Sequence, residues 1–260
     1  MCVLFIALNA HPRCPLIIAV ARDEFYERPT EAAAFWNDYP HILAGRDLKG
    51  GGTWLGITRT GRFATVTNFR DLGRVKPDGP SRGGLVSAYL ASRDAPDAYL
   101  TALRPQGGLY SGFNIVLGDP RGLWYFSNIS EEMIRIPDGI HGISNHLLDT
   151  PWPKVERAKD RLGALVKHNG DPSPDAFFKA LADTSRPDDS RLPDTGVGIE
   201  WERILSSLFV MSPQYGTRSS TFISVDRSGG VVFVERVYHG NPSRHTSRAF
   251  AFTLPGPRDG

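Results

Sequence analysis

Two apolar segments at the start of the chain constrain its fold more than any other feature. Residues 3–8 (VLFIAL) and 16–20 (LIIAV) are rich in β-branched side chains, and the turn-forming residues 11–15 (HPRCP) separate them. Neither segment alternates apolar with polar residues, which indicates strands that are covered on both faces. Chain ends are normally frayed, so a chain that begins directly on a buried strand is unusual.

Further strands and helices are predicted along the rest of the chain. The expected strands are residues 53–58, 63–68, 113–118, 123–127 and 249–253, with a hairpin formed by residues 222–225 and 231–237. The expected helices are residues 82–91, 95–103, 153–167 and 174–181, and the polar, proline-containing residues 183–198 form a loop. Strands at both ends enclose helices in the middle, which favours one α+β domain over residues 1–260.

Composition excludes several classes of protein. With 30 Lys and Arg against 28 Asp and Glu, the formal net charge is +2, so no polybasic nucleic-acid arm is expected. The 27 Gly and 20 Pro residues exclude an all-helical bundle. Two cysteines exclude a disulfide scaffold and a four-cysteine metal site. No apolar run reaches the roughly 20 residues of a membrane span, and no signal peptide is expected, so we expect a soluble cytoplasmic protein.

Cys2 is the first residue with the potential for chemistry. Removal of Met1 would leave a thiol, with a reference pKa of about 8.5, beside its own α-amine, with a reference pKa of about 7.7–8.0. Such an amine can accept the proton of its neighbouring nucleophile, so no separate histidine is required. The alternative is a small residue at a frayed chain end.

Charged residues follow the second apolar segment. If the first two strands pair, Arg22 and Asp23 lie close to the beginning of the first strand. An arginine near a thiol favours the thiolate. A carboxylate there would orient a terminal amine, and either Asp23 or Glu24 could supply it. The alternative is a solvated cluster of surface ion pairs.

Three asparagines lie at the ends of predicted strands or just before a turn. They are Asn68 (in Thr67–Arg70), Asn114 and Asn145. A positioned amide can stabilise the oxyanion of acyl transfer, although each asparagine alone is also typical of a turn or a helix cap. No metal-ligand spacing or nucleotide-binding motif is present, and a Cys14–Pro15 pair of the kind seen at thiolate haem sites is a weak signal.

Several longer motifs together resemble the NRDE family, also called the Transport and Golgi organization family. They are Met1–Cys2 at a strand start, residues 21–30 (ARDEFYERPT), 45–47 (GRD), 52–56 (GTWLG), 67–70 (TNFR), 112–114 (GFN), 144–145 (SN), 151–154 (PWPK) and 215–218 (YGTR). Ala21 stands where the family has its signature asparagine. The family is similar to the N-terminal nucleophile (Ntn) hydrolases, which implies a four-layer αββα sandwich of two antiparallel sheets between helices.

The resemblance to Ntn cysteine amidases also implies roles for particular residues. Cys2 corresponds to the nucleophile, Arg22 and Asp23 to its companions, Asn145 to an oxyanion donor and Arg218 to a distal arginine. By position alone, Asn68, Arg70 and Asn114 are candidates for binding substrate.

The implied activity is hydrolysis of an amide or other acyl bond, such as a thioester, in a small-molecule substrate without a metal or cofactor. The alternative is a non-enzymatic protein on the same fold that binds or carries haem or an acyl lipid. Haem would then be its ligand.

Overall fold

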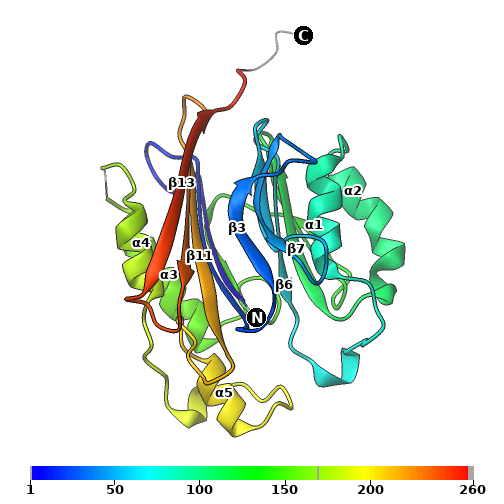
Figure 1. Ribbon diagram of the computed structural model, residues 1–260, viewed down its shortest axis with the longest axis vertical. Coiled ribbons are helices and arrows are strands. Elements are labelled where there is room, and N and C mark those ends of the chain that lie inside the picture. Colours follow the sequence, from blue (N-terminus) through cyan, green and yellow to red (C-terminus); the bar gives the residue numbers. More distant parts are fainter. Residues whose placement is uncertain (1, 169, 257–260) are drawn as a thin grey trace. The chain divides into compact units, whose positions relative to one another are not determined.

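The computed structural model describes residues 2–168 and 170–256, and the chain forms two compact units. The first unit contains the chain up to Glu27 together with Pro137–Thr253. The second contains Arg28–Ile136 and the end of the chain from Leu254. In each unit, helices pack on one face of an antiparallel sheet (Figure 1). The α+β class predicted from the sequence is therefore confirmed.

The sheet of the first unit has six described strands, and the first strand of the chain lies inside it. The order is β10 (Gly139–Ile143), β1 (Cys2–Leu8), β2 (Leu16–Phe25), β11 (Tyr215–Val225), β12 (Gly230–Tyr238) and β13 (His245–Thr253). All neighbouring strands are antiparallel. Because β1 has a hydrogen-bonded neighbour on each side, this strand is held inside the sheet from Cys2 onward.

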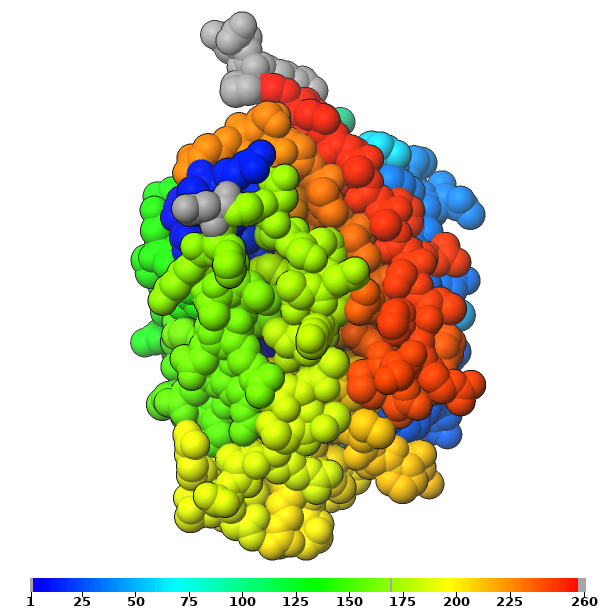
Figure 2. Space-filling model, turned by 90° about the vertical axis from the view of Figure 1, so that its left-hand side faces the viewer, coloured from blue at the N-terminus to red at the C-terminus, as the bar shows by residue number. Residues whose placement is uncertain are grey.

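Helices α3 (Pro153–Val166) and α4 (Pro174–Leu181) cover one face of this sheet. Phe5 packs with Leu162 and Phe178 in their shared apolar cluster. Leu4, on the opposite face of the strand, is also fully buried, as the absence of polar alternation predicts. Figure 2 shows this unit from its helical side, with α3 and α4 in light green and the 183–198 loop and α5 (Ile199–Leu205) in yellow below them.

The second unit is built on a seven-stranded sheet in simple sequence order. Its strands are β3 (Thr30–Phe35), β4 (Ile42–Asp47), β5 (Leu55–Thr58), β6 (Phe63–Asn68), β7 (Phe113–Asp119), β8 (Gly122–Ser127) and β9 (Met133–Arg135). Helices α1 (Arg82–Ala91) and α2 (Pro96–Leu103) pack on it, and Leu85 and Leu100 share a core with Ile115. Short 3₁₀ turns lie at Leu72–Arg74 and Arg104–Leu109 in this unit and at Asp189–Arg191 in the first unit.

Every strand and helix predicted from the sequence is present, and most ends differ by no more than two residues. Three strands are longer than predicted: β2 ends five residues later, and β11 and β13 begin seven and four residues earlier. The prediction missed five elements, namely β3, β4, β9, β10 and α5. Over the described residues, no helix combines the length and the apolar character needed to cross a membrane.

Candidate functional site

The candidate site lies in the first unit, where β1 begins and β2 ends. Cys2 pairs with Arg22 across the β1–β2 ladder, and Arg22 pairs with Ser219 across the β2–β11 ladder. Directly paired residues of an antiparallel sheet point to the same face, so these three side chains form a row across adjacent strands. The exposed fractions of Cys2, Arg22 and Ser219 are 8%, 5% and 4%. Cys2 is thus a buried strand residue beside an arginine, not a residue at a frayed end.

Asp23 occupies the opposite face of the sheet from Arg22 because successive strand residues alternate. Its carboxylate accepts a hydrogen bond from Lys154 Nζ at 3.0 Å and another from Thr217 Oγ1 at 2.6 Å. Lys154 belongs to α3, which covers that face. The Asp23 carbonyl accepts a hydrogen bond from the Tyr215 hydroxyl at 3.0 Å. Asp23 is therefore a buried and fixed residue, not part of a solvated surface cluster.

The environment of Cys2 acts on its thiol in opposing directions. Burial raises the pKa of the Cys2 thiol, and the negative charge of Asp23 raises it further. The charge of Arg22 and the backbone N–H of Asp23 lower it. The net effect in the described chain is a raised pKa, so this thiol needs a proton acceptor to react as a thiolate. Met1, whose removal is expected from the sequence, lies outside the described residues.

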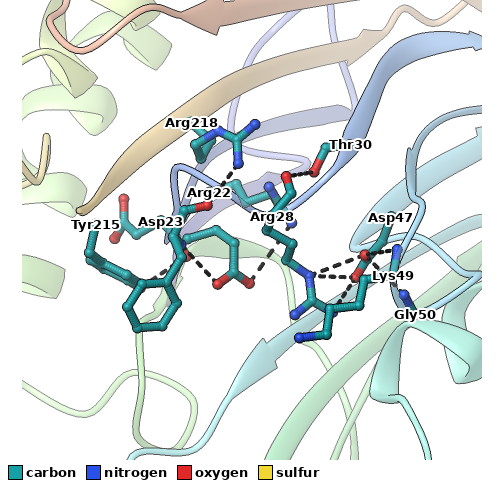
Figure 3. A network of polar contacts seen from close by, with 11 residues as sticks. Arg22, Asp23, Arg28, Thr30, Asp47, Lys49, Gly50, Tyr215 and Arg218 are labelled. Atoms are coloured by element: carbon teal, nitrogen blue, oxygen red, sulfur yellow. Dashed lines mark hydrogen bonds and ion pairs between the residues drawn. The ribbon is translucent and has the colours of Figure 1, made fainter.

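A β-bulge between Thr217 and Ser219 sets the directions of the side chains in β11. In a regular strand these two residues would share a face, whereas the bulge places Thr217 beside Asp23 and Ser219 beside Arg22. Arg218 is the extra residue, and its Nη1 donates to the carbonyl of Phe25 at 2.8 Å (Figure 3). Burial lowers the pKa of Arg218, and the like charge of Arg22 lowers it further.

Ser144 and Asn145 follow β10 and approach the other side of Cys2. The Ser144 hydroxyl donates to the Cys2 carbonyl at 3.1 Å and lies 3.3 Å from Asn145 Oδ1. Both side chains are buried. The structure thus places Cys2, Arg22, Asp23, Asn145 and Arg218 around one end of the first unit's sheet.

Asn68, Arg70 and Asn114 lie in the second unit, at the paired ends of β6 and β7. Asn114 is buried, its amide donates to Thr67 Oγ1 at 3.2 Å, and its oxygen accepts from the Tyr125 hydroxyl at 2.8 Å. Arg70 is buried just beyond β6, and Asn68 is half-buried. Asn114 thus has structural hydrogen bonds, and substrate binding by these three residues stays a prediction.

Lys154, Thr217 and Ser219 were not singled out from the sequence. One signal pointed to Lys154: a cation in the first turn of a helix is disfavoured by the helix dipole, so a carboxylate partner is expected. The placement of Thr217 and Ser219 beside β2 depends on the strand register and on the bulge, for which the local sequence gives no signal.

Cys14 has a packing role in the structure. It is buried in the apolar cluster beneath α3 and α4, and its N–H donates to His11 Nδ1 at 3.0 Å. This position gives no support to the Cys14–Pro15 pair as a haem ligand. Within residues 2–168 and 170–256, no group of three or more His, Cys, Asp or Glu side chains is arranged to hold a metal ion.

The two helix-covered antiparallel sheets place the protein among those with an Ntn-hydrolase-like fold. The structure is similar to that of the C2A mutant of conjugated bile acid hydrolase from Clostridium perfringens, with a TM-score of 0.50 and 9% identity, covering 98% of this chain and 92% of that one. At this identity, the likeness concerns the fold.

Sequence comparison identifies the family. The family model described as Transport and Golgi organisation 2 matches residues 1–240. The Transport and Golgi organization 2 homologues of Mus musculus and Bos taurus are 34% and 36% identical over 98% of this chain and 99% of their own length. The chain therefore belongs to the Transport and Golgi organisation 2 family, as the motifs in its sequence predicted.

Proposed function

We propose that this protein is a cysteine hydrolase of the Ntn type, which cleaves an amide or other acyl bond through Cys2. The observation that carries the proposal is the buried Cys2 thiol at the start of an internal strand, directly paired with Arg22. The fold shared with conjugated bile acid hydrolase supports it, because the structure compared is a mutant of that enzyme at a cysteine in position 2.

In this proposal, removal of Met1 frees the α-amine of Cys2, which accepts the thiol proton directly or through water. The sulfur then attacks the acyl carbon. As the tetrahedral intermediate collapses, the bond to the amine or other leaving group breaks, and the leaving group takes up the proton. Water attacks the resulting thioester, releasing the carboxylic acid and restoring the thiol. Arg22 favours the thiolate, and the Asn145 amide donates to the developing oxyanion.

Asp23 acts in this scheme through its backbone. Lys154 and Thr217 already engage its carboxylate on the far face of the sheet. The backbone N–H of Asp23, after the charge of Arg22, favours the thiolate form of Cys2. Asp23 is therefore a positioning residue, and its ion pair fixes the strand end at which this N–H meets the sulfur.

The proposal is tested by intact-protein mass spectrometry and by acylation with p-nitrophenyl acetate. We expect the purified protein to lack Met1 and to release a burst of p-nitrophenolate as Cys2 becomes acylated. Cys2→Ala should abolish the burst, and Asn145→Ala should slow acylation about 10²–10³-fold, the usual cost of losing an oxyanion donor.

Cys14→Ala is the matched control because it removes the protein's other thiol, which lies in the apolar cluster. It should retain the burst. A retained Met1, or a burst that persists in Cys2→Ala, would contradict the proposal.

A further inference from the structure

The hydroxyl of Ser219 is a buried polar group that no described residue satisfies. Ser219 is 4% exposed, and no hydrogen-bond partner for its Oγ is found over the described ranges 2–168 and 170–256. A buried hydroxyl without a partner costs about 1–3 kcal/mol, and most such groups in folded proteins are paired. An unsatisfied hydroxyl next to a candidate active site therefore points to a ligand as its partner.

The fold directs this hydroxyl to the face that carries Cys2. Ser219 lies on that face only because the bulge at Arg218 reverses the alternation of β11. The row Cys2, Arg22, Ser219 crosses two strand intervals of about 4.8 Å each, so Ser219 is about 10 Å from Cys2. A substrate held by both residues would span about that distance between its acyl carbon and the group bound at Ser219.

Two guanidinium groups lie near this hydroxyl. Arg22 is the direct neighbour of Ser219 in the row, and Arg218 precedes Ser219 in the chain. Arg22 and Arg218 are close enough for the charge of one to lower the pKa of the other, whereas Glu24 acts in the opposite direction. Glu24 forms an ion pair with Arg22, with 3.9 Å between Oε2 and Nη2. Two guanidiniums and a hydroxyl are donors suited to an anionic oxygen group.

We infer that Ser219 is a substrate-positioning residue, which together with Arg22 and Arg218 binds a carboxylate about 10 Å from the acyl carbon attacked by Cys2. This inference rests on the proposed function and names its substrate class: acyl compounds that carry a carboxylate at that distance. Arg22 then favours the thiolate of Cys2 and also binds the substrate carboxylate, because it lies between Cys2 and Ser219 in the row.

The test compares alkylation of Cys2 by ω-maleimido carboxylic acids of increasing chain length with alkylation by the matching amides. Peptide mass spectrometry separates modification of Cys2 from that of Cys14. We expect the acid to react faster than its amide only when the chain spans about 10 Å. Ser219→Ala should remove about tenfold of this preference, the effect of losing one hydrogen bond to a charged group, and Ser219→Thr should restore it.

Ser220→Ala is the matched control. Ser220 is the next residue of β11 and is also buried. It pairs with Ala21 of the apolar cluster beneath α3 and α4, so it lies on the opposite face from Cys2. It should retain the full preference for the acid. A preference that is undiminished in Ser219→Ala, or that is absent from the wild type at every chain length, would overturn the inference.

The experiment also separates this inference from the proposed function. Should the wild type show the acid preference, reduced in Ser219→Ala, but give no burst with p-nitrophenyl acetate, then the carboxylate subsite stands and the hydrolase proposal fails. A burst without any acid preference would support the hydrolase proposal and overturn the carboxylate subsite.

Discussion

Asp23 and Lys154 form an ion pair that is almost completely shielded from solvent. The exposed fractions of their side chains are 0% and 5%, and Lys154 Nζ lies 3.0 Å from Asp23 Oδ2. Charges in such a place depend on each other, because removal of one partner leaves the other buried without compensation. This pair connects the first turn of α3 to β2, the strand that pairs with β1 beside Cys2.

We predict that Lys154→Met lowers the free energy of unfolding by about 3–5 kcal/mol, since it leaves the Asp23 carboxylate charged in the interior. Asp23→Asn combined with Lys154→Met removes both charges and should recover most of this loss. Urea denaturation of the two single variants and the double variant measures the coupling. Losses that simply add in the double variant would show that the two charges are not coupled.

At the scale of elements, the packing of α1 explains why a glycine stands at position 52, the last of the three glycines at residues 50–52 before β5. A Cβ on Gly52 would lie 2.4 Å from the backbone carbon and oxygen of Gly83 in the first turn of α1. The N–H of Thr53 donates to the same Gly83 carbonyl at 3.3 Å. The loop and the helix thus meet backbone to backbone, and neither side can move aside as a flexible side chain would.

Gly52→Ala should therefore destabilise the protein by about 1–3 kcal/mol, the usual cost of overpacking. Gly84→Ala, one residue further along α1, is the control, because a Cβ there meets nothing within 4 Å. Since alanine favours a helix over glycine by roughly 0.5–1 kcal/mol, this control should stabilise the protein. In thermal unfolding, Tm should fall for Gly52→Ala and rise for Gly84→Ala. Equal shifts in Tm would contradict the packing argument.

The spacing of apolar residues and the positions of proline and glycine between segments determined which elements could be predicted. The bounds of β6, α1 and α4 agree with the sequence-based prediction residue for residue. Strand β3 (TEAAAF) was missed because alanines and a glutamate dominate it, and β10 (GIHGI) because two of its five residues are glycines. Helix α5 has only seven residues and follows a polar loop, so its periodicity is too short to detect.

At the scale of the whole molecule, the site combines segments that are far apart in the chain. The proximity of Cys2 and Arg22 could be predicted, because a short turn joins their strands. The position of Ser219 could not, since it depends on strand pairing across almost 200 residues and on a bulge that changes the face. The contact of Lys154 with Asp23 depends on how α3 packs on the sheet, across 131 residues of the chain. Sequence motifs therefore identified the family and pointed to part of the candidate site, while the place of Ser219 in the row beside Cys2 required the register of the sheet.

A second polar cluster in the first unit should affect how the stability of the molecule depends on pH. Asp149 Oδ2 lies 2.6 Å from His141 Nδ1, and its Oδ1 accepts from Lys159 Nζ at 2.8 Å. The hydrogen bond to Asp149 raises the pKa of His141 against the effect of burial. Burial opposes the shift at Asp149, but hydrogen bonds from His141, Lys159 and the Gly142 N–H lower its pKa to about 2.

These shifts define a pH window for the contribution of the cluster. The lowered pKa of Asp149 gives stability above its unfolded pKa of about 3.9, which is lost as the pH falls toward 2. The raised pKa of His141 gives stability that is complete below about 6.5 and is lost as the pH rises through the folded value. The contribution should therefore be largest between about pH 4 and 6.5.

Asp149→Asn tests this pH window because it removes the carboxylate charge on which the pKa shifts of both Asp149 and His141 depend. Asp149 has a φ of +56°, a conformation that asparagine also tolerates, so the backbone should accept the substitution. Urea denaturation from pH 2 to 9 should show the largest loss of stability relative to the wild type between about pH 4 and 6.5, with a smaller loss on either side. A difference independent of pH would mean that Asp149 acts through its hydrogen bonds alone, and that the charge of His141 contributes nothing to folding.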